Sequence, residues 1–242
     1  MVESVVSMKI SRSFTVIRYE NALLFDDART KNNIVKRYKG AYPIVDFNEQ
    51  IKAILIIDPQ KKTKCMIHAD HIVVDINDPR DLNALKTTVN DIVPFVLKEL
   101  EIQTTQYIGV RAHAIPELLL TKDKTEAEIL RRYYSPALLD FIKNENPQDG
   151  INPHVGFSIM LGAGFTMNVN IAPSQNVTGE VGPDGQLHIK EFVDSNPLVD
   201  LDVYTDVSKE LTQINGVIKG ACGNIEKYLE KVWNMHTGSV FR

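Results

Sequence analysis

Hydrophobic residues recur at three- and four-residue spacing in two long segments, and this spacing predicts two amphipathic helices. On the first helix, one side carries Leu82, Leu85, Val89, Ile92, Val96 and Leu100. We expect this helix to begin at Asp78 and Pro79, a cap acceptor followed by proline, and we expect Pro94 to kink or break it near Asn90. The second helix spans 207–236 and is capped by Thr205 or Asp206. Its apolar side carries Val207, Leu211, Ile214, Ile218, Ala221, Ile225, Leu229 and Val232.

Shorter segments with alternating or β-branched residues predict strands ahead of each helix. The strands expected before the first helix are 5–19, 53–57 and 64–76, of which the last two form a hairpin. After that helix we expect a strand at 103–115 and a weaker helix at 124–144, with a break at Pro136. The strands expected before the last helix are 154–172, 175–181, 187–193 and 198–205.

The order of these elements, strands and then a long helix, occurs twice. This order predicts an α+β fold of antiparallel sheets with helices packed on one face, built from two similar halves. The cluster of turn residues at 146–150 is the best boundary, and it divides the chain into 1–146 and 147–242. One continuous domain is the alternative.

Net charge, cysteine content and apolar stretches exclude only a few classes of protein. The net charge is −4, so the chain has no global basic field, and we do not expect nucleic acid as its partner. Cys65 and Cys222 are too few for a disulfide framework, which indicates a reducing compartment. The start of the chain lacks the pattern of a signal peptide, and no 18-residue apolar stretch occurs. We therefore expect a cytoplasmic protein that does not bind a membrane.

Two short motifs carry a resemblance to a known group of proteins. The first is the predicted strand at 107–115, with Gly109 and Arg111, and the second is Leu201-Asp202-Val203-Tyr204 before the long terminal helix. In this order of motifs the chain resembles a sporadically distributed family of uncharacterised prokaryotic proteins of about 250 residues. Ala112 stands where that family usually has an aromatic residue. The resemblance implies a fold but no chemistry, and the family's scattered occurrence would fit accessory genes of mobile elements or phage defence.

The sharpest polar cluster combines His68, Asp70, Arg111 and His113. Alternation along a strand puts His68 and Asp70 on one face, and Arg111 and His113 also share a face. If the two strands are neighbours, the four side chains could hold a divalent metal or bind a phosphate. The alternative is a solvent-facing group of histidine and aspartate side chains that pair across strands.

Three glycines, Gly216, Gly220 and Gly223, recur at four- and three-residue spacing within the last predicted helix. Such a smooth ridge lets another backbone approach closely. The ridge packs either against the sheet of the same chain or against a second copy in a homodimer.

No catalytic or cofactor motif stands out, so the sequence favours a protein that is not an enzyme and needs no cofactor. We expect a protein-binding, regulatory or adaptor protein whose partner is another protein or a second copy of itself. The alternative is a metal- or phosphate-dependent hydrolase that uses His68, Asp70, Arg111 and His113.

Overall fold

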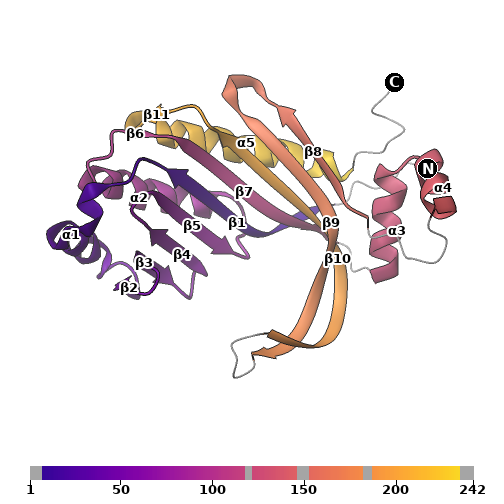
Figure 1. Cartoon of the computed structure of the whole chain (residues 1–242), viewed down its shortest axis with the longest axis horizontal. Helices are drawn as coiled ribbons and strands as arrows, with labels where there is room; N and C mark the ends of the chain where they lie inside the picture. Colours follow the sequence, from indigo (N-terminus) through magenta and orange to yellow (C-terminus); the bar gives the residue numbers. More distant parts are fainter. Residues whose placement is uncertain (1–6, 118–121, 146–152, 182–186, 235–242) are drawn as a thin grey trace.

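The computed structural model describes residues 7–117, 122–145, 153–181 and 187–234, and these form a large antiparallel sheet with helices on one face. The α+β fold predicted from the sequence is confirmed (Figure 1). In order across the sheet, its strands are β2 (Ile44–Asn48), β3 (Ala53–Asp58), β4 (Thr63–Ile67), β5 (His71–Asn77), β1 (Met8–Arg18), β7 (Tyr107–Pro116), β10 (Leu187–Thr205), β9 (Thr166–Val181) and β8 (Val155–Met160). A second, small sheet pairs β6 (Thr104–Thr105) with β11 (Lys209–Glu210).

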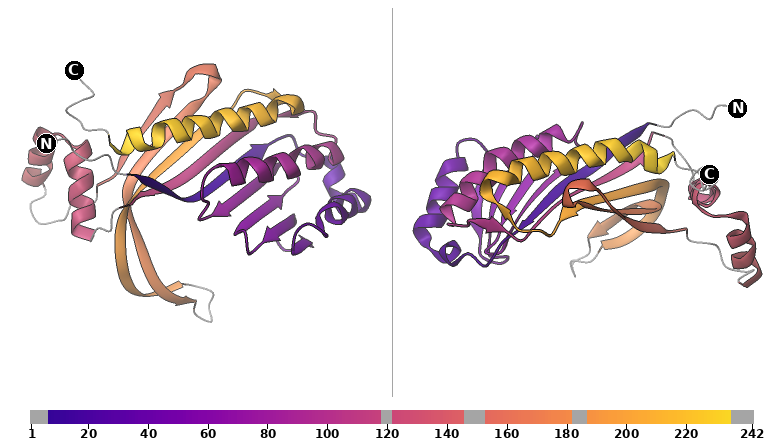
Figure 2. Two further views of the ribbon diagram at one scale, coloured as in Figure 1. Left: turned by 180° about the vertical axis from the view of Figure 1, so that it is seen from behind. Right: turned by 90° about the horizontal axis from the view of Figure 1, so that it is seen from above.

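Two long helices, α2 (Asn83–Glu99) and α5 (Ile214–Trp233), lie across one face of the large sheet (Figure 2, left). The hydrophobic core lies in this layer, because alternate strand residues such as Val110 and Leu201 point at the helices and are fully buried. The helix α1 (Ala28–Tyr38) packs beside α2 and against β2 and β3. Neither α2 nor α5 covers the opposite side of the central strands, which we call the open face.

The order of the strands is nearly symmetric about the pairing of β1 with β7. Outward from this pair, β5, β4 and β3 on one side match β10, β9 and β8 on the other. Each half runs from a central strand through a helical segment to an antiparallel meander, of four strands in the first half and three in the second, and then to a long helix. The meander returns its last strand to pair with the central one. The two similar halves therefore share one continuous sheet, related by an approximate two-fold axis between β1 and β7.

The first half differs from the sequence prediction at the turn before β5 and at the start of its long helix. The expected strand 64–76 is two strands, β4 and β5, because the chain turns at 68–70, where the His68 amide donates to the His71 carbonyl. The first long helix begins at Asn83 and not at Pro79. Asp78 has a φ of +51°, and its carboxylate pairs with Lys9 and Lys62, so this residue closes a turn and caps no helix.

Pro94 does not break α2, which is continuous through it. The proline lies on the exposed side of the helix, whereas Val93, Val96 and Leu97 around it are fully buried. Packing of these side chains against the sheet holds the helical path although one backbone hydrogen bond is missing.

The second half differs at the start of its helix and at its strand joints. Residues 207–213 precede α5, and Glu210 and Gln213 form a reciprocal capping box one turn ahead of the helix, so neither Thr205 nor Asp206 caps it. The expected strand 154–172 is divided into β8 and β9 at 162–164, where Ala163 and Gly164 have positive φ. By contrast, the expected strands 187–193 and 198–205 form the single strand β10.

The β9–β10 hairpin reaches far beyond the sheet. Pairing of β10 with β7 starts at Val199, and pairing of β9 with β8 stops at Ile171, so the distal part of the hairpin is a two-stranded arm. This arm extends away from the sheet and curves (Figure 1).

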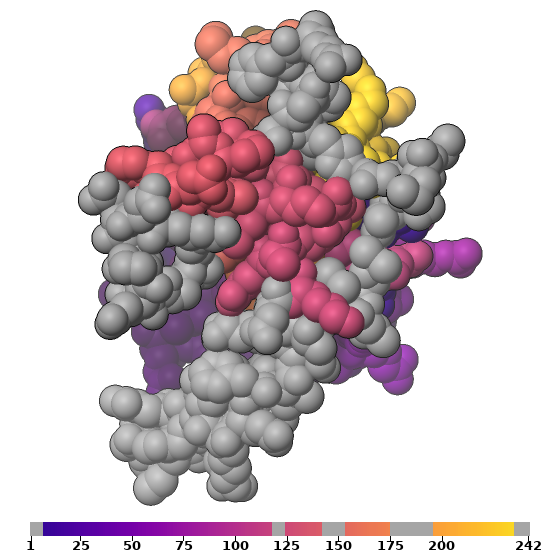
Figure 3. All heavy atoms as spheres, turned by 90° about the vertical axis from the view of Figure 1, so that its right-hand side faces the viewer, coloured from indigo at the N-terminus to yellow at the C-terminus, as the bar shows by residue number. Residues whose placement is uncertain are grey.

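Helices α3 (Lys122–Tyr133) and α4 (Pro136–Glu145) confirm the predicted helical segment and its break at Pro136. They form part of the surface at one end of the molecule (Figure 3). The proposed boundary at 146–150 lies outside the described residues, and the division into 1–146 and 147–242 stays a prediction.

The end of α3 is fixed to the end of α5 by one buried arginine. The Arg132 guanidinium donates to Glu128 at 2.6 Å and to the Trp233 carbonyl at 3.0 Å, and it stacks on the Trp233 ring at 4.7 Å. Tyr133 donates its hydroxyl to the Val232 carbonyl at 2.7 Å. These bonds satisfy carbonyl groups that the last turn of α5 leaves unpaired.

We predict that Arg132→Ala lowers the free energy of unfolding by about 2–4 kcal/mol. The substitution removes a buried guanidinium that donates to Glu128 and to the Trp233 carbonyl and stacks on the Trp233 ring. The measurement is the urea midpoint, with Arg80→Ala as control because Arg80 is exposed. Equal midpoints for the two variants would contradict the structural role of Arg132.

Candidate functional site

Two arginine–aspartate pairs lie at the centre of the open face. On β1, Arg12 donates two hydrogen bonds to the Asp75 carboxylate of β5, at 2.9 and 2.7 Å. On β7, Arg111 makes the same two-pronged contact with Asp200 of β10. Both pairs run diagonally: Asp75 is two residues from the register partner of Arg12, and Asp200 is two residues from that of Arg111. The pairs are therefore equivalent under the approximate two-fold axis.

Two rings lie between the arginine–aspartate pairs. Phe14 of β1 is opposite Arg111, and both guanidinium groups lie near its ring, that of Arg12 at 5.2 Å and that of Arg111 at 5.7 Å from the centroid. The His113 ring meets Phe14 edge-on at 5.8 Å, and its Nε2 lies 3.6 Å from the Asp200 carboxylate. Burial lowers the pKa of His113 despite the nearby Asp200 carboxylate. We call Arg12, Phe14, Asp75, Arg111, His113 and Asp200 the central cluster.

A β-bulge in β1 sets the position of Arg12. The register between β1 and β7 shifts between Ile10 and Arg12, and the Ser11 hydroxyl donates to the His113 carbonyl at 3.2 Å. The bulge adds one residue to β1, so Arg12 and Phe14 both point to the open face. Strict alternation from the start of the strand would not place Arg12 there.

Asp202 differs from Asp75 and Asp200, the carboxylates of this face that bind the two arginines. It lies directly opposite Arg111, yet Arg111 binds Asp200 instead. In the part of the chain that the structure describes, Asp202 makes no hydrogen bond or ion pair, although it is half-buried. Burial raises the pKa of Asp202, partly offset by the positive charge of Arg111. Its counterpart in the first half is Asn77, the register partner of Arg12.

Next to Asp202, an aromatic stack covers a glycine. The Tyr107 ring stacks on Tyr204 at 5.6 Å, and the Arg18 guanidinium lies 5.5 Å from its centroid. A Cβ on Gly109 would lie 2.4 Å from the Tyr107 hydroxyl, so only glycine lets Tyr107 lie in this position. The match of Gly109 to the family motif thus has a packing reason in this chain. Burial raises the pKa of Tyr107 to about 12.

The four residues of the proposed metal or phosphate site do not come together. Arg111 and His113 do share the open face, where both contact Asp200. His68 and Asp70 lie in the turn before β5, where Asp70 binds His71 at 2.6 Å and the His68 and His71 rings stack at 4.3 Å. β1 separates β5 from β7, and His71 is level with Tyr107, four residues or about 13 Å along β7 from Arg111.

The three glycines of the ridge on α5 have different surroundings. A Cβ on Gly220 would lie 3.1 Å from the Phe165 ring, so this glycine allows the residue ahead of β9 to pack on the helix. A Cβ on Gly216 or Gly223 would meet nothing within 4 Å among the described residues. Packing within the chain therefore accounts for Gly220, and the homodimer interpretation stays a prediction.

Two kinds of functional site have no counterpart in the described residues. No group of three or more histidine, cysteine, aspartate or glutamate side chains is arranged there to hold a metal ion. Over the same residues, no helix is both long and apolar enough to cross a membrane.

Two surface hollows, of about 430 and 540 Å³, lie beside α2 and away from the central cluster.

Comparisons with known proteins give no family. No family model and no curated protein matches the chain. Among solved structures, aspartate kinase of Clostridium acetobutylicum, described as an important allosteric enzyme for industrial amino acid production, aligns with 91% of this chain at 11% identity and a TM-score of 0.23. The alignment spans 34% of that kinase chain, and a likeness this weak carries no argument.

We predict that Arg111→Ala lowers the free energy of unfolding by about 2–3 kcal/mol, because Asp200 stays buried without its main partner. In the double variant Arg111→Ala/Asp200→Asn, much of this loss should be recovered because position 200 no longer carries a buried charge that lacks its partner. Urea unfolding of the wild type, both single variants and the double variant gives the coupling energy. Purely additive effects would show that the pair is not coupled.

Asp202→Asn should not lower the free energy of unfolding at pH 7, whereas Arg111→Ala should lower it. Because the folded state raises the pKa of Asp202 above its ordinary 3.8, the ionised carboxylate costs stability at every pH above the raised value. We expect Asp202→Asn to be at least as stable as the wild type at pH 7, with an advantage that shrinks as pH falls toward 4. Urea midpoints across this range provide the measurement, with exposed Asp206→Asn as control. A variant less stable than the wild type at pH 7 would contradict the buried-charge argument.

Proposed function

We propose that this protein acts without catalysis by binding another protein through the open face of its sheet, as a regulatory or adaptor protein. The observation that carries the proposal is a row of apolar side chains on that face. Val16, Val73, Met66 and Leu55 are register neighbours on β1, β5, β4 and β3, and each is half-buried. The solvated face of an antiparallel sheet ordinarily carries polar side chains at such positions. We call these four residues the apolar row.

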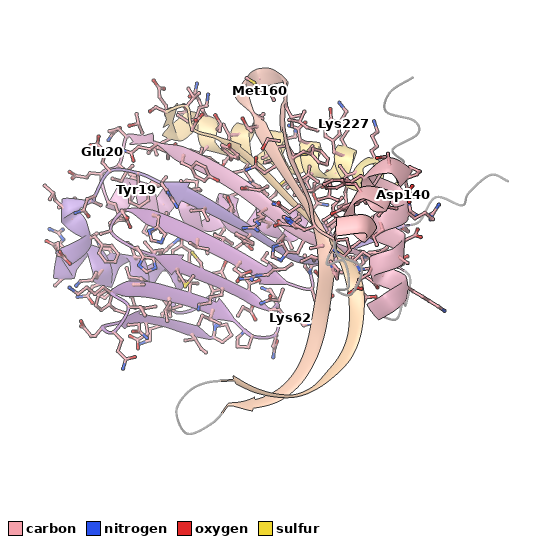
Figure 4. All side chains as sticks on the ribbon, turned by 45° about the vertical axis from the view of Figure 1, so that its right-hand side comes forward. Tyr19, Glu20, Lys62, Asp140, Met160 and Lys227 are labelled. Carbon is pink, nitrogen blue, oxygen red and sulfur yellow. The ribbon has the colours of Figure 1, made fainter. Side chains whose placement is uncertain are left out.

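The central cluster supports the same proposal. Arginine and aromatic side chains are enriched in protein interfaces and supply much of their binding energy. Here Arg12 and Arg111 are each held by a two-pronged ion pair and by the Phe14 ring. Side chains already fixed in place lose little conformational entropy when a partner binds. Figure 4 draws the side chains on the ribbon, with Tyr19 and Lys62 among the labelled residues.

A metal- or phosphate-dependent hydrolase is not favoured by any specific contact. That alternative needs His68 and Asp70 beside Arg111 and His113, and the intervening strand β1 keeps them apart. A cytoplasmic location and a role in a mobile element or in phage defence stay hypotheses, and the identity of a captured partner would test both.

The test begins with capture of host proteins on the immobilised full-length chain at moderate salt, followed by purification of any stoichiometric partner. We expect direct binding of the purified partner, weakened by about tenfold or more in Met66→Lys. The charged amine would lie in the middle of the apolar row, and the flexible side chain can reach solvent in the unbound protein.

Leu23→Lys is the matched control, because Leu23 is an apolar side chain that is 89% exposed on a different part of the surface. Circular dichroism verifies that both variants are folded. A purified partner that binds Met66→Lys as tightly as the wild type overturns the open-face proposal. A partner that proves to be a second copy of the chain would appear as a dimer by mass in solution, and Met66→Lys must then dissociate it.

A further inference from the structure

The apolar surface of the open face continues from the apolar row into the second half, through the aromatic stack on β7 and β10. Val16, at the end of the apolar row, is opposite Gly109 on β7, and Gly109 is in turn opposite Tyr204 on β10. Gly109 has no side chain, but the Tyr107 ring lies over it, since a Cβ on Gly109 would lie 2.8 Å from two carbons of that ring. The Tyr107 ring stacks on Tyr204 at 5.6 Å. Apolar side chains therefore follow one another from β1 to β10.

We call this longer surface the six-strand row. In order from β3 to β10, its members are Leu55, Met66, Val73, Val16, Tyr107 and Tyr204. Every member is half-buried, so each one still offers part of its side chain to a partner. Because neighbouring strands lie about 4.8 Å apart, the row is about 24 Å long and runs across the strands.

The direction of the row favours a helix as the segment that covers it. Such a segment lies on the face of the sheet, where the strands have already paired their backbone groups with one another. An extended segment would bury its own N–H and C=O groups against apolar side chains without partners. A helix satisfies these groups internally. Its apolar side chains also recur about every 5 Å along one side, close to the spacing of the strands.

Two cations beside the row set the chemistry of that helix. Arg18 and Lys64 lie two residues along β1 and β4 from members of the row, so alternation puts both on the open face. Arg18 is opposite His71, and Lys64 is opposite Asp75. These two partners lie on either side of Val73 on β5, so the cations flank the row from both sides. Neither cation makes an ion pair with another residue that the structure describes.

The carboxylates of this region form no ion pair with these two cations. Asp75 and Asp70 each already bind another side chain. Asp46 and Asp202 lie beside the two ends of the row, on β2 and β10. Acidic side chains of a docked helix therefore fit its middle turns, where they face the two cations, and are repelled at its ends.

We propose that the partner protein docks an amphipathic helix of about 16 residues along the six-strand row, with acidic side chains toward Arg18 and Lys64. The length follows from the row of about 24 Å and a rise of about 1.5 Å per residue. The inference rests on the protein-binding function proposed above, and it names the form and the charge of the segment that binds.

The test uses the full-length chain and three fluorescently labelled synthetic peptides of about 18 residues. The first has leucine at three- and four-residue spacing and glutamate on both flanks of its middle turns. The second has lysine in place of those glutamates, and the third has the composition of the first in an order without a helical stripe. We expect fluorescence anisotropy to show saturable binding of the glutamate peptide, with a Kd below about 100 µM, and binding at least about tenfold weaker for the other two. No saturable binding of the glutamate peptide, or equal binding of either control peptide, overturns the proposal.

Charge reversal locates the helix on the protein. In Arg18→Glu/Lys64→Glu, the lysine peptide should bind more tightly than the glutamate peptide, because the apolar contacts stay and the flanking charges change sign. Arg18→Glu alone, at an exposed position, should shift the ratio of the two affinities in the same direction, and it replaces the double variant if circular dichroism shows that variant to be unfolded. A peptide preference that is unchanged in these variants overturns the assignment to the six-strand row.

A substitution at the far end tests the length of the row. Tyr204→Lys should weaken the glutamate peptide by about tenfold or more, with Leu23→Lys as control, and an affinity equal to that of the wild type overturns the extension to β10. Failure of the helix and failure of the protein-binding function are distinguishable. If the peptides do not bind but a purified partner loses affinity in Met66→Lys, the helix alone is overturned. A partner unaffected by Met66→Lys overturns the protein-binding function, whatever the peptides do.

Discussion

The antiparallel pairing of β1 with β7 is the contact on which the rest of the structure depends. It joins two meanders that each end in a long helix, and it brings α2 and α5 to the same side of one sheet. Each half alone would expose the edge of its central strand and much of the apolar face that its helix only partly covers. The join buries both edges and produces a single core across nine strands.

The same pairing creates the central cluster. Phe14 comes opposite Arg111, and Arg12 comes opposite His113, so each half contributes one arginine and one ring. Each arginine then binds an aspartate from the last strand of its own meander. Buried ion pairs add little net stability compared with apolar side chains, but they are costly to break. Such a cluster fixes the strand register, because a slip of one residue would put charges on the core side.

The two halves differ in strands and side chains that lie outside their shared symmetric core. The second half has the long β9–β10 arm, Tyr107 on Gly109, and Asp202 where the first half has Asn77. The first half has the extra strand β2 and the apolar row that crosses β1, β5, β4 and β3. Symmetric features hold the sheet together and form the central cluster, whereas the apolar row of the proposed protein-binding surface belongs to the first half alone.

The sequence by itself determined the two helices, most of the strands and the repeated order of strands and then a helix, because these depend on local hydrophobic periodicity. It also placed Arg111 and His113 on one face and marked Asp202 within a motif. Only the tertiary structure decided the partners of these residues. The order of strands puts β1 between β5 and β7 and so separates His68 and Asp70 from Arg111. The bulge at Ser11 and the diagonal choice of Asp200 over Asp202 depend on contacts between segments about a hundred residues apart, which no local pattern encodes.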